Sequence, residues 1–480
     1  MRREHQGDAG RLRVPPRPPA GEAAGRDLPG RARARLAALG EQMAPLRRLL
    51  ADPMAPIVAL CVILVLSFAA RMIDYNEPCS SPCKTPASHT LIFDEAYYVN
   101  AAKVIDHINP GSGENYHNAP LGKDPNAEHP QLAKLIIAGA IELFGDGPFA
   151  WRIGSMLFSL IALCALYALV RGLGGSGWLA VGTVGVASLD NLFLVSSRVG
   201  TLDIYALTLM LIAMALYVRR RPLLAGIALG VGMCMKEVAV YLLAVIVVYE
   251  LLALIRRWWQ TGSLQGFLRE YVRPVAIAIG GTAVTFLLLL LLLDVLVPAY
   301  DTGTHIEYAG NPFAHFFHMI HYATLLKAEP SKPGISSSPW EWLLNEKVIP
   351  YAKTVVTTKA NGHVVGLHPI YLFLGEINPF IIFLAIPALF CCLACWWRSG
   401  DRVCLLGVAW FLGTFLPSVL ESEVYDRVNY IYYMLIVVPA IYVMLARVFG
   451  DRRVPRAALV GWVIMLAFGF GDLYPIRTLL

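Results

Sequence analysis

Charge is scarce in this sequence: only 15% of its 480 residues are Asp, Glu, Lys or Arg, while 57% are hydrophobic. A soluble domain carries roughly a quarter charged residues. The composition therefore excludes an ordinary soluble protein and indicates that lipid surrounds most of the chain. The formal net charge of +6 does not indicate nucleic-acid binding. The arginines gather in the first fifty positions and in short gaps between apolar segments, which is typical of membrane topology.

Two further absences limit metal chemistry. The sequence has no Asp-x-Asp pair of the sort that nucleotide-sugar enzymes use, so we expect an enzyme without a metal and with no cofactor. Only two of the nine cysteines, Cys79 and Cys83, lie in a predicted external loop, and no His or further Cys is near enough to complete a zinc site. The two thiols either form a disulfide or stay free.

Residues 1–48 contain almost no large apolar side chains and are rich in Arg, Pro, Gly and Ala. This composition predicts a disordered cytosolic tail. The first apolar segment begins near Pro56, which is deeper than a cleaved signal peptide allows. We therefore expect two parts, the tail and a membrane domain over residues 49–480.

Apolar segments near the ~20 residues that cross a bilayer recur along the membrane domain. The eleven candidates are Pro56–Ile73, Phe149–Val170, Trp178–Val195, Leu202–Val218, Pro222–Met235, Val238–Ile255, Val275–Val297, Pro379–Trp397, Val403–Leu420, Tyr430–Ala446 and Ala457–Phe470. A shorter segment, Leu132–Phe144, is expected to be an interfacial or re-entrant helix, because counting it as a crossing would invert the Arg pattern for every later segment. The fold class is thus an all-α integral membrane protein with about eleven transmembrane helices.

The gaps on one side of this topology carry Arg, and those on the other side carry acidic residues. The positive-inside rule then places the N-terminus in the cytoplasm and the C-terminus outside a cell membrane. Two long loops fall on the outer side, residues 74–148 and 298–378. We expect the first to hold catalytic groups and a helix.

Several segments on the outer side resemble the bacterial protein O-mannosyltransferases of glycosyltransferase family 39. They are Phe93-Asp94-Glu95-x-x-Tyr98, His129-Pro130-x-x-x-Lys134, Phe149-Ala150-Trp151-Arg152, Ser197-Arg198-Val199-Gly200-Thr201-Leu202-Asp203, Lys236 after a Gly-rich segment, Ser338-Pro339-Trp340-Glu341-Trp342 and Arg427-Val428-Asn429-Tyr430. The resemblance implies a C-type glycosyltransferase fold and a polyprenyl-phosphate-linked sugar, usually mannose, that is passed to Ser or Thr hydroxyls. The chain departs from the family at Gln131, where a second proline is common.

The adjacent carboxylates Asp94 and Glu95 are the candidate catalytic residues. Such a transfer needs a base for the acceptor hydroxyl, and the resemblance implies that Asp94 serves as that base in an inverting single displacement. The alternative is that Asp94 only caps the helix that follows it. Glu95 is expected to position the acceptor, and Tyr98, one helical turn on, either lines the site or packs.

Cations must also meet the departing polyprenyl phosphate. Arg198, Lys236 and Arg427 are the candidates, because they lie at the outer ends of predicted helices where topology does not call for them. The alternative is ion pairing, of Arg198 with Asp203, Lys236 with Glu237, and Arg427 with Glu423 or Asp426. A further set is expected to support the site or bind substrate: His129, Lys134, Asp203, Trp340 and Glu341. His129 either orients the site or only ends its loop, and Trp340 is equally an interfacial anchor.

The expected function is transfer of a sugar, most simply mannose, from a polyprenyl-phosphate donor to secreted or membrane proteins at the outer face of the membrane. An alternative within the same enzyme class is transfer to a lipid or cell-wall glycan. A membrane transporter is the alternative from another class, but no inverted repeat is apparent and the charged residues gather outside rather than at mid-bilayer. The sequence does not decide the sugar, the acceptor, the polyprenyl length or the oligomeric state.

Overall fold

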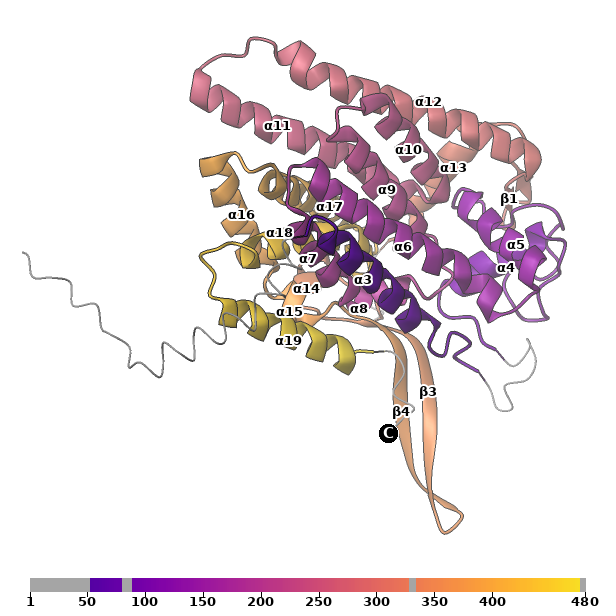
Figure 1. The fold of residues 1–480 in the computed structure, drawn as a ribbon. Coiled ribbons are helices and arrows are strands. Elements are labelled where there is room, and N and C mark those ends of the chain that lie inside the picture. The colour runs from indigo at the N-terminus through magenta and orange to yellow at the C-terminus, as the bar shows by residue number, and fades with distance from the viewer. Residues whose placement is uncertain (1–51, 80–88, 328–333, 475–480) are drawn as a thin grey trace, which may run out of the picture. The chain divides into compact units, whose positions relative to one another are not determined.

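The computed structural model describes residues 52–79, 89–327 and 334–474. The chain divides into two units, Met1–Ala55 and Pro56–Leu480, and the described helices and strands lie in the second apart from Ala55 at the start of α3. Helices dominate this second unit (Figure 1). Cys83 and the tail over residues 1–48 lie outside the described residues.

Within the described part of the chain, six helical segments are long and apolar enough to cross a membrane. Their elements are α3 (Ala55–Met72), α6 (Pro148–Gly172), the 3-10 turn η2 (Glu237–Val240) with α11 (Tyr241–Thr261), the π turn η3 (Leu268–Val272) with α12 (Arg273–Leu296), α15 (Pro379–Ile382) with α16 (Ala385–Ser399), and α17 (Arg402–Tyr425). A continuous helix satisfies every backbone hydrogen bond within lipid. The protein is thus a mostly helical, multi-pass membrane protein.

The remaining apolar segments form shorter helices: α7 (Gly177–Ser188), α8 (Asn191–Ser196), α9 (Asp203–Tyr217), α10 (Pro222–Met235), the 3-10 turn η4 (Ile431–Ile436) with α18 (Val438–Phe449), and α19 (Arg456–Asp472). The predicted span Trp178–Val195 is broken between α7 and α8. At the break, the buried Asp190 carboxylate accepts hydrogen bonds from the backbone N–H of Asn378 and the hydroxyl of Tyr442.

The first loop contains α4 (Glu95–Ile105) and α5 (Leu132–Phe144), as expected of a helical loop. α5 packs on α4 and α6. The second long loop differs from an all-α expectation. It contains a short pair, β1 (Tyr300–Asp301) with β2 (Ile306–Glu307), then α13 (Pro312–Leu325), α14 (Pro339–Leu343), and the antiparallel strands β3 (Ile349–Ala360) and β4 (His363–Gly375).

The β3–β4 hairpin is the clearest departure from the predicted fold class, and it projects from the helices in Figure 1. Its register pairs Ala360 with His363, which leaves Asn361 and Gly362 as a two-residue loop. Both have a positive φ, 51° and 81°. Asn-Gly is the preferred pair for such a turn, and it follows a β-branched run at residues 354–358. The sequence thus contained a hairpin signal that a search for apolar runs overlooks.

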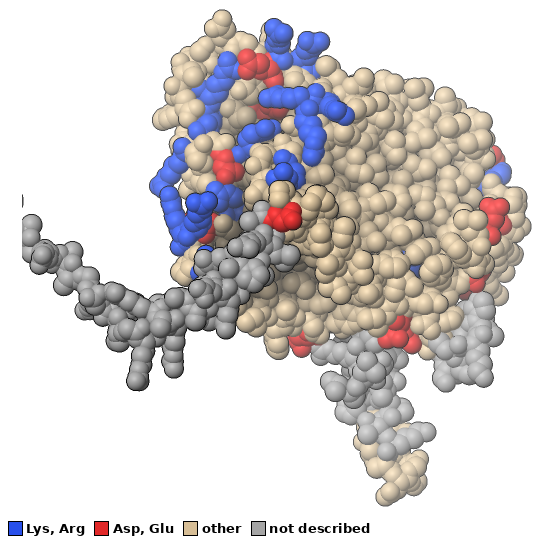
Figure 2. Space-filling view, viewed as in Figure 1, with Lys and Arg blue, Asp and Glu red and all other residues tan. Residues whose placement is uncertain are grey.

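Arginines from several gaps meet at one end of the helices. Figure 2 shows Lys and Arg gathered over the ends of α11, α12 and α16. At this end Arg219 donates to the carbonyl of Ala168, Arg402 to that of Val218 (3.3 Å) and Arg256 to that of Trp397 (3.1 Å). The gaps that the sequence assigned to one side of the membrane therefore do lie together, and we call this the Arg-rich end.

Helix α10 is pressed against α12 through two glycines. A Cβ at Gly226 would lie 2.5 Å from the carbonyl oxygen of Ala278, and a Cβ at Gly230 would lie 2.7 Å from Cβ of Thr285. Small residues four apart allow this approach of two membrane helices. Because α10 ends at Met235, the close packing also fixes the position of Lys236, its C-cap residue.

We expect Gly230→Val to separate α10 from α12 and to lower thermal stability in detergent, because its side chain would overlap backbone atoms. Overpacking of this kind costs about 1–3 kcal/mol. Gly280→Val is the matched control, since Gly280 lies exposed on α12 and a Cβ added there would meet no atom within 4 Å. Equal melting temperatures for the two variants would contradict the packing account.

Candidate functional site

Glu95 organises the start of α4. Its carboxylate is wholly buried and accepts two hydrogen bonds from Arg152, from Nε at 2.8 Å and from Nη2 at 2.9 Å. The backbone N–H groups of Gly200 (2.8 Å) and Ile92 (2.7 Å) also donate to it. Four donors satisfy both oxygens. The expected role of Glu95 in contacting an acceptor is therefore not supported, because the carboxylate has no open face.

The same arginine ties three segments together. Nη1 of Arg152 donates to the carbonyls of Tyr75 and Glu77, both at 2.6 Å, beyond the end of α3. Gly200 can approach Glu95 because it has no side chain: a Cβ there would lie 2.7 Å from the carbonyl oxygen of Trp151. Close packing therefore explains why a glycine occupies this position of the Ser-Arg-Val-Gly-Thr-Leu-Asp motif.

Asp94, one residue before Glu95, lacks such hydrogen-bond donors in the described part of the chain. It occupies the N-cap of α4 with helical angles (φ −68°, ψ −9°), and its side chain makes no capping hydrogen bond. Among the described residues, no hydrogen bond or ion pair engages its carboxylate. The residue is half-buried. The alternative role as a helix cap is therefore absent from this structure.

The surroundings of Asp94 set its protonation. Burial raises the pKa of the Asp94 carboxyl to about 6; the positive charge of Lys236 and the nearby His129 lower that pKa, whereas Asp203 raises it. A carboxyl with a pKa near the working pH is suited to accept and release a proton.

Lys236 is buried beside this carboxyl, with 4% of its surface exposed. Its Nζ lies 2.9 Å and 3.0 Å from the two oxygens of Asp203, the first residue of α9. It also lies 5.6 Å from the centre of the Tyr432 ring. The partner differs from the alternative in the sequence analysis, where Lys236 pairs with Glu237. The ion pair with Asp203 therefore fixes the position of the Lys236 ammonium group at the end of α10.

Glu237 instead pairs with His129, whose Nδ1 lies 2.9 Å from its Oε2. The His129 ring meets the ring of Tyr98 edge-on at 5.7 Å. Lys134, wholly buried in α5, forms an ion pair with Asp124 and donates to the carbonyls of Asn126 (2.6 Å) and His129 (2.8 Å). The loop before α5 is therefore fixed by Lys134 so that His129 faces α4 and η2.

Aromatic rings pack around Phe93, the residue directly before Asp94. Phe93 stacks on Tyr351 at the base of β3, with ring centres 5.0 Å apart, and meets Tyr432 edge-on at 5.9 Å. Tyr432 contacts Tyr433 in turn, at 4.6 Å. The base of the hairpin is thus part of the site wall.

Arg427 lies next to this aromatic group. Its Nη1 donates to Glu421 at 2.7 Å, and its guanidinium lies 5.9 Å from the centre of the Tyr433 ring. Its Nε is buried without a hydrogen-bond partner among the described residues. The observed acid is Glu421, rather than Glu423 or Asp426 as the alternative supposed. A buried N–H without a partner is costly, and it marks a donor available to an anion.

Arg198 differs from the other two cations. It is 1% exposed, and its guanidinium donates to the carbonyls of Ala70 (3.3 Å), Ile73 (2.6 Å) and Asp74 (3.1 Å). The expected phosphate contact is not supported for Arg198, because these carbonyls and the Tyr474 hydroxyl engage both of its Nη atoms. The alternative pairing with Asp203 is absent too, since Asp203 binds Lys236.

The second loop contributes little polar chemistry from its Trp-Glu-Trp motif. Glu341 closes a capping box with Ser338 and pairs with Lys347 at 2.8 Å, so its expected contact with substrate is not supported. Trp340 is exposed and touches Phe415 edge-on at 5.7 Å. Cys79 is disulfide-bonded, whereas Cys83 lies outside the described residues.

Three residues of the site escaped the sequence analysis in these roles. Arg152 lies inside a quoted motif and Tyr432 lies just after one, but neither was assigned a role from the sequence. Glu237 was considered only as an ion-pair partner of Lys236. Glu237 had a signal in the sequence, because it directly follows Lys236 at a predicted helix end. Arg152 closes the quoted Phe-Ala-Trp-Arg segment, and Tyr432 lies two residues after the quoted Arg-Val-Asn-Tyr segment. One metal-ligand cluster occurs among the described residues, Cys395, Asp401 and Cys404. It lies at the Arg-rich end, where Asp401 pairs with Arg447.

Known proteins are similar to this chain over much of its length. A family described as dolichyl-phosphate-mannose-protein mannosyltransferase matches residues 128–268. The polyprenol-phosphate-mannose–protein mannosyltransferase of Corynebacterium glutamicum is 27% identical over 420 residues, covering 76% of this chain and 78% of that protein. The chain is thus similar to protein O-mannosyltransferases over most of its length. A protein of the same name from Mycolicibacterium smegmatis is 22% identical, and the alignment covers 87% of this chain and 88% of that protein.

Solved structures agree on the fold. The Pmt1–Pmt2 O-mannosyltransferase complex of S. cerevisiae, bound to the sugar donor, aligns with a TM-score of 0.60 at 11% identity, over 88% of this chain and 90% of that one. ArnT from Cupriavidus metallidurans, bound to undecaprenyl phosphate, aligns with a TM-score of 0.53 at 17% identity over 86% of this chain. This chain spans 62% of the ArnT chain. At these identities the likeness establishes a C-type glycosyltransferase fold.

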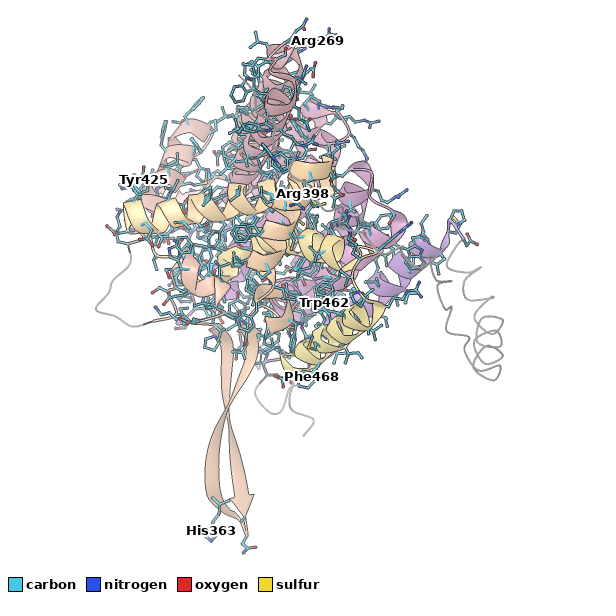
Figure 3. All side chains as sticks on the ribbon, turned by 90° about the vertical axis from the view of Figure 1, so that its left-hand side faces the viewer. Arg269, His363, Arg398, Tyr425, Trp462 and Phe468 are labelled. Atoms are coloured by element: carbon cyan, nitrogen blue, oxygen red, sulfur yellow. The ribbon has the colours of Figure 1, made fainter. Side chains whose placement is uncertain are left out.

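We expect Arg152→Met to destabilise the protein by about 3–5 kcal/mol, the cost of leaving a buried carboxylate without its partner. Thermal unfolding in detergent measures this loss. Arg269→Met is the matched control, because Arg269 is exposed at the η3 turn (Figure 3). If both variants melt at the wild-type temperature, Glu95 does not depend on Arg152.

Proposed function

We propose that the protein transfers mannose from a polyprenyl-phosphate donor to Ser or Thr hydroxyls of secreted or membrane proteins, by an inverting single displacement. The names of the relatives support the donor and the acceptor class. The single observation that carries the proposal is the Asp94 carboxylate: half-buried, without a partner among the described residues, and beside the buried cation of Lys236.

In the proposed reaction, the acceptor oxygen attacks the anomeric carbon from the face opposite the phosphate. The new carbon–oxygen bond forms as the bond to the phosphate oxygen breaks, and Asp94 takes the hydroxyl proton. The polyprenyl phosphate leaves with one more negative charge. Lys236 and Arg427 are the cations placed to meet it, and fixed charges aimed at developing charge lower the barrier most.

The other groups position these three. Asp203 holds Lys236, while Glu421 and Tyr433 hold Arg427. Glu237 orients His129 against Tyr98, and Lys134 fixes the loop that carries His129. We propose that no metal takes part, because Lys236 and Arg427 would supply the positive charge that the leaving phosphate needs.

We also propose the topology that the sequence indicated: eleven crossings, the N-terminus in the cytoplasm, and the site on the outer face of the cell membrane. The grouping of arginines at one end supports this orientation, since positive charge is retained on the cytoplasmic side. Asp94, Lys236 and Arg427 occupy helix ends on the side that the Arg pattern leaves outside.

We expect Asp94→Asn to lower kcat by about 10²–10⁴-fold, the usual contribution of a general base. The assay follows labelled mannose from a polyprenyl-phosphate donor to a Thr-rich peptide, with purified protein and a chelator present. Asp106→Asn at the C-cap of α4 is the matched control and should keep wild-type activity. An Asp94→Asn enzyme that is folded and as fast as wild type would refute the assignment.

The pH profile supplies a second test. Asp94 is active as the carboxylate, and its pKa is raised to about 6, so transfer should decline as the pH falls through 6. Lys236 lowers this pKa, so Lys236→Met should move the acidic limb to higher pH, whereas Lys236→Arg should leave it near wild type. Unchanged limbs in both variants would show that another group controls the profile.

A further inference from the structure

A polar cavity lies at the Arg-rich end, away from the groups described above. Its volume is about 190 Å³, and it opens between α9, α11, α16 and α17. Polar residues that line it include Arg220, Arg256, Arg402, Tyr217, Tyr249 and Glu250. Figure 3 looks onto this end, with Arg398 of α16 near the centre of the view.

The three arginines keep free donors. Within the described residues, none of them forms an ion pair. Arg256 uses Nε on the carbonyl of Trp397 at 3.1 Å, and Arg402 makes two long hydrogen bonds, 3.4 Å to the hydroxyl of Tyr249 and 3.3 Å to the carbonyl of Val218. A guanidinium has five N–H donors, so most of theirs remain available.

The acidic residues of the cavity are already engaged. Glu270 pairs with Arg257, outside the set of three. Glu250 accepts a hydrogen bond from the hydroxyl of Tyr217 at 2.9 Å. The three arginines therefore outnumber Glu250, the one lining acid without an ion pair among the described residues, and the excess of positive charge favours an anion.

One of the arginines packs closely against a glycine. Gly400 ends α16 with φ +73°, and a Cβ there would lie 2.8 Å from Nη1 and 3.1 Å from Nη2 of Arg256. The guanidinium thus rests directly on the Gly400 backbone. A held cation loses less entropy on binding than a free surface side chain.

An open apolar groove lies on α16, one of the helices that line the cavity. It has a volume of about 470 Å³ and is lined by Phe390, Leu393, Ala394, Trp397 and Arg398 along α16. Trp397 of the groove contacts the cavity residue Arg256, because its carbonyl accepts a hydrogen bond from Arg256 at 3.1 Å. Its ring lies 6.0 Å from that of Trp259. Tryptophans beside arginines are typical of the membrane interface.

We propose that this cavity binds the phosphate of an anionic lipid, whose acyl chain lies along the α16 groove. The charge fits a phosphate, because Arg donors match phosphate oxygens in a fork. The apolar groove beside it fits a chain that a free phosphate lacks. Basic pockets between membrane helices are known binders of lipid head groups. The site is separate from Asp94 and independent of the sugar that is transferred.

Native mass spectrometry of the purified protein can test this with dioleoyl phosphatidylglycerol, dioleoyl phosphatidylcholine and inorganic phosphate as probes. We expect phosphatidylglycerol to bind in preference to phosphatidylcholine, and millimolar phosphate not to displace it. Arg256→Gln with Arg402→Gln should weaken its binding by at least about tenfold, from lost charge-assisted hydrogen bonds. Arg220→Gln, a single change at an exposed position, should weaken it in the same direction.

Arg452→Gln with Arg453→Gln is the control, because it removes the same charge from exposed positions at the same end. Weakening in the cavity variants alone supports the site. Equal weakening in the control, or equal binding of the two lipids by wild type, overturns it. Displacement of the lipid by phosphate alone would overturn the lipid assignment.

Discussion

The buried ion pair between Glu95 and Arg152 is the contact on which the site depends. It joins the start of α4, the first turns of α6, the segment after α3 and the turn at Gly200, all within hydrogen-bond distance of two side chains. Burying two charges is unfavourable unless each is fully hydrogen-bonded, and here backbone donors and acceptors complete both. The same pair determines where the neighbouring Asp94 can point.

The two adjacent carboxylates therefore differ in their hydrogen bonding. Glu95 takes four donors, and Asp94 receives none from the described residues. The electrostatics around Asp94 follow from helix ends: Asp203 begins α9, Lys236 ends α10, and the tight packing of α10 on α12 fixes the position of the cation. A free carboxylate of raised pKa beside a held cation is an arrangement suited to proton transfer next to a leaving anion.

The sequence predicted the features that depend on local pattern. Apolar length located the helices, and the Phe-Asp-Glu motif located Asp94. Features that depend on tertiary packing were not predictable in the same way. The sequence does not distinguish an arginine that faces a phosphate, as proposed for Arg427, from one that donates to backbone carbonyls. Arg198 is of the second kind, because it donates to carbonyls at the end of α3. The Asn361-Gly362 pair predicts a hairpin turn, but it lies outside any of the apolar segments used to locate the helices.

The central claim is that the donor phosphate lies between Lys236 and Arg427 with Asp94 facing the sugar. A cryo-EM structure of the protein with a polyprenyl-phosphate mannose analogue tests it most directly. The account predicts phosphate oxygens within hydrogen-bond distance of Lys236 Nζ and Arg427 Nε, and the Asp94 carboxylate on the opposite side of the anomeric carbon. A phosphate bound at Arg198, or an Asp94 carboxylate turned away from the sugar, would contradict it.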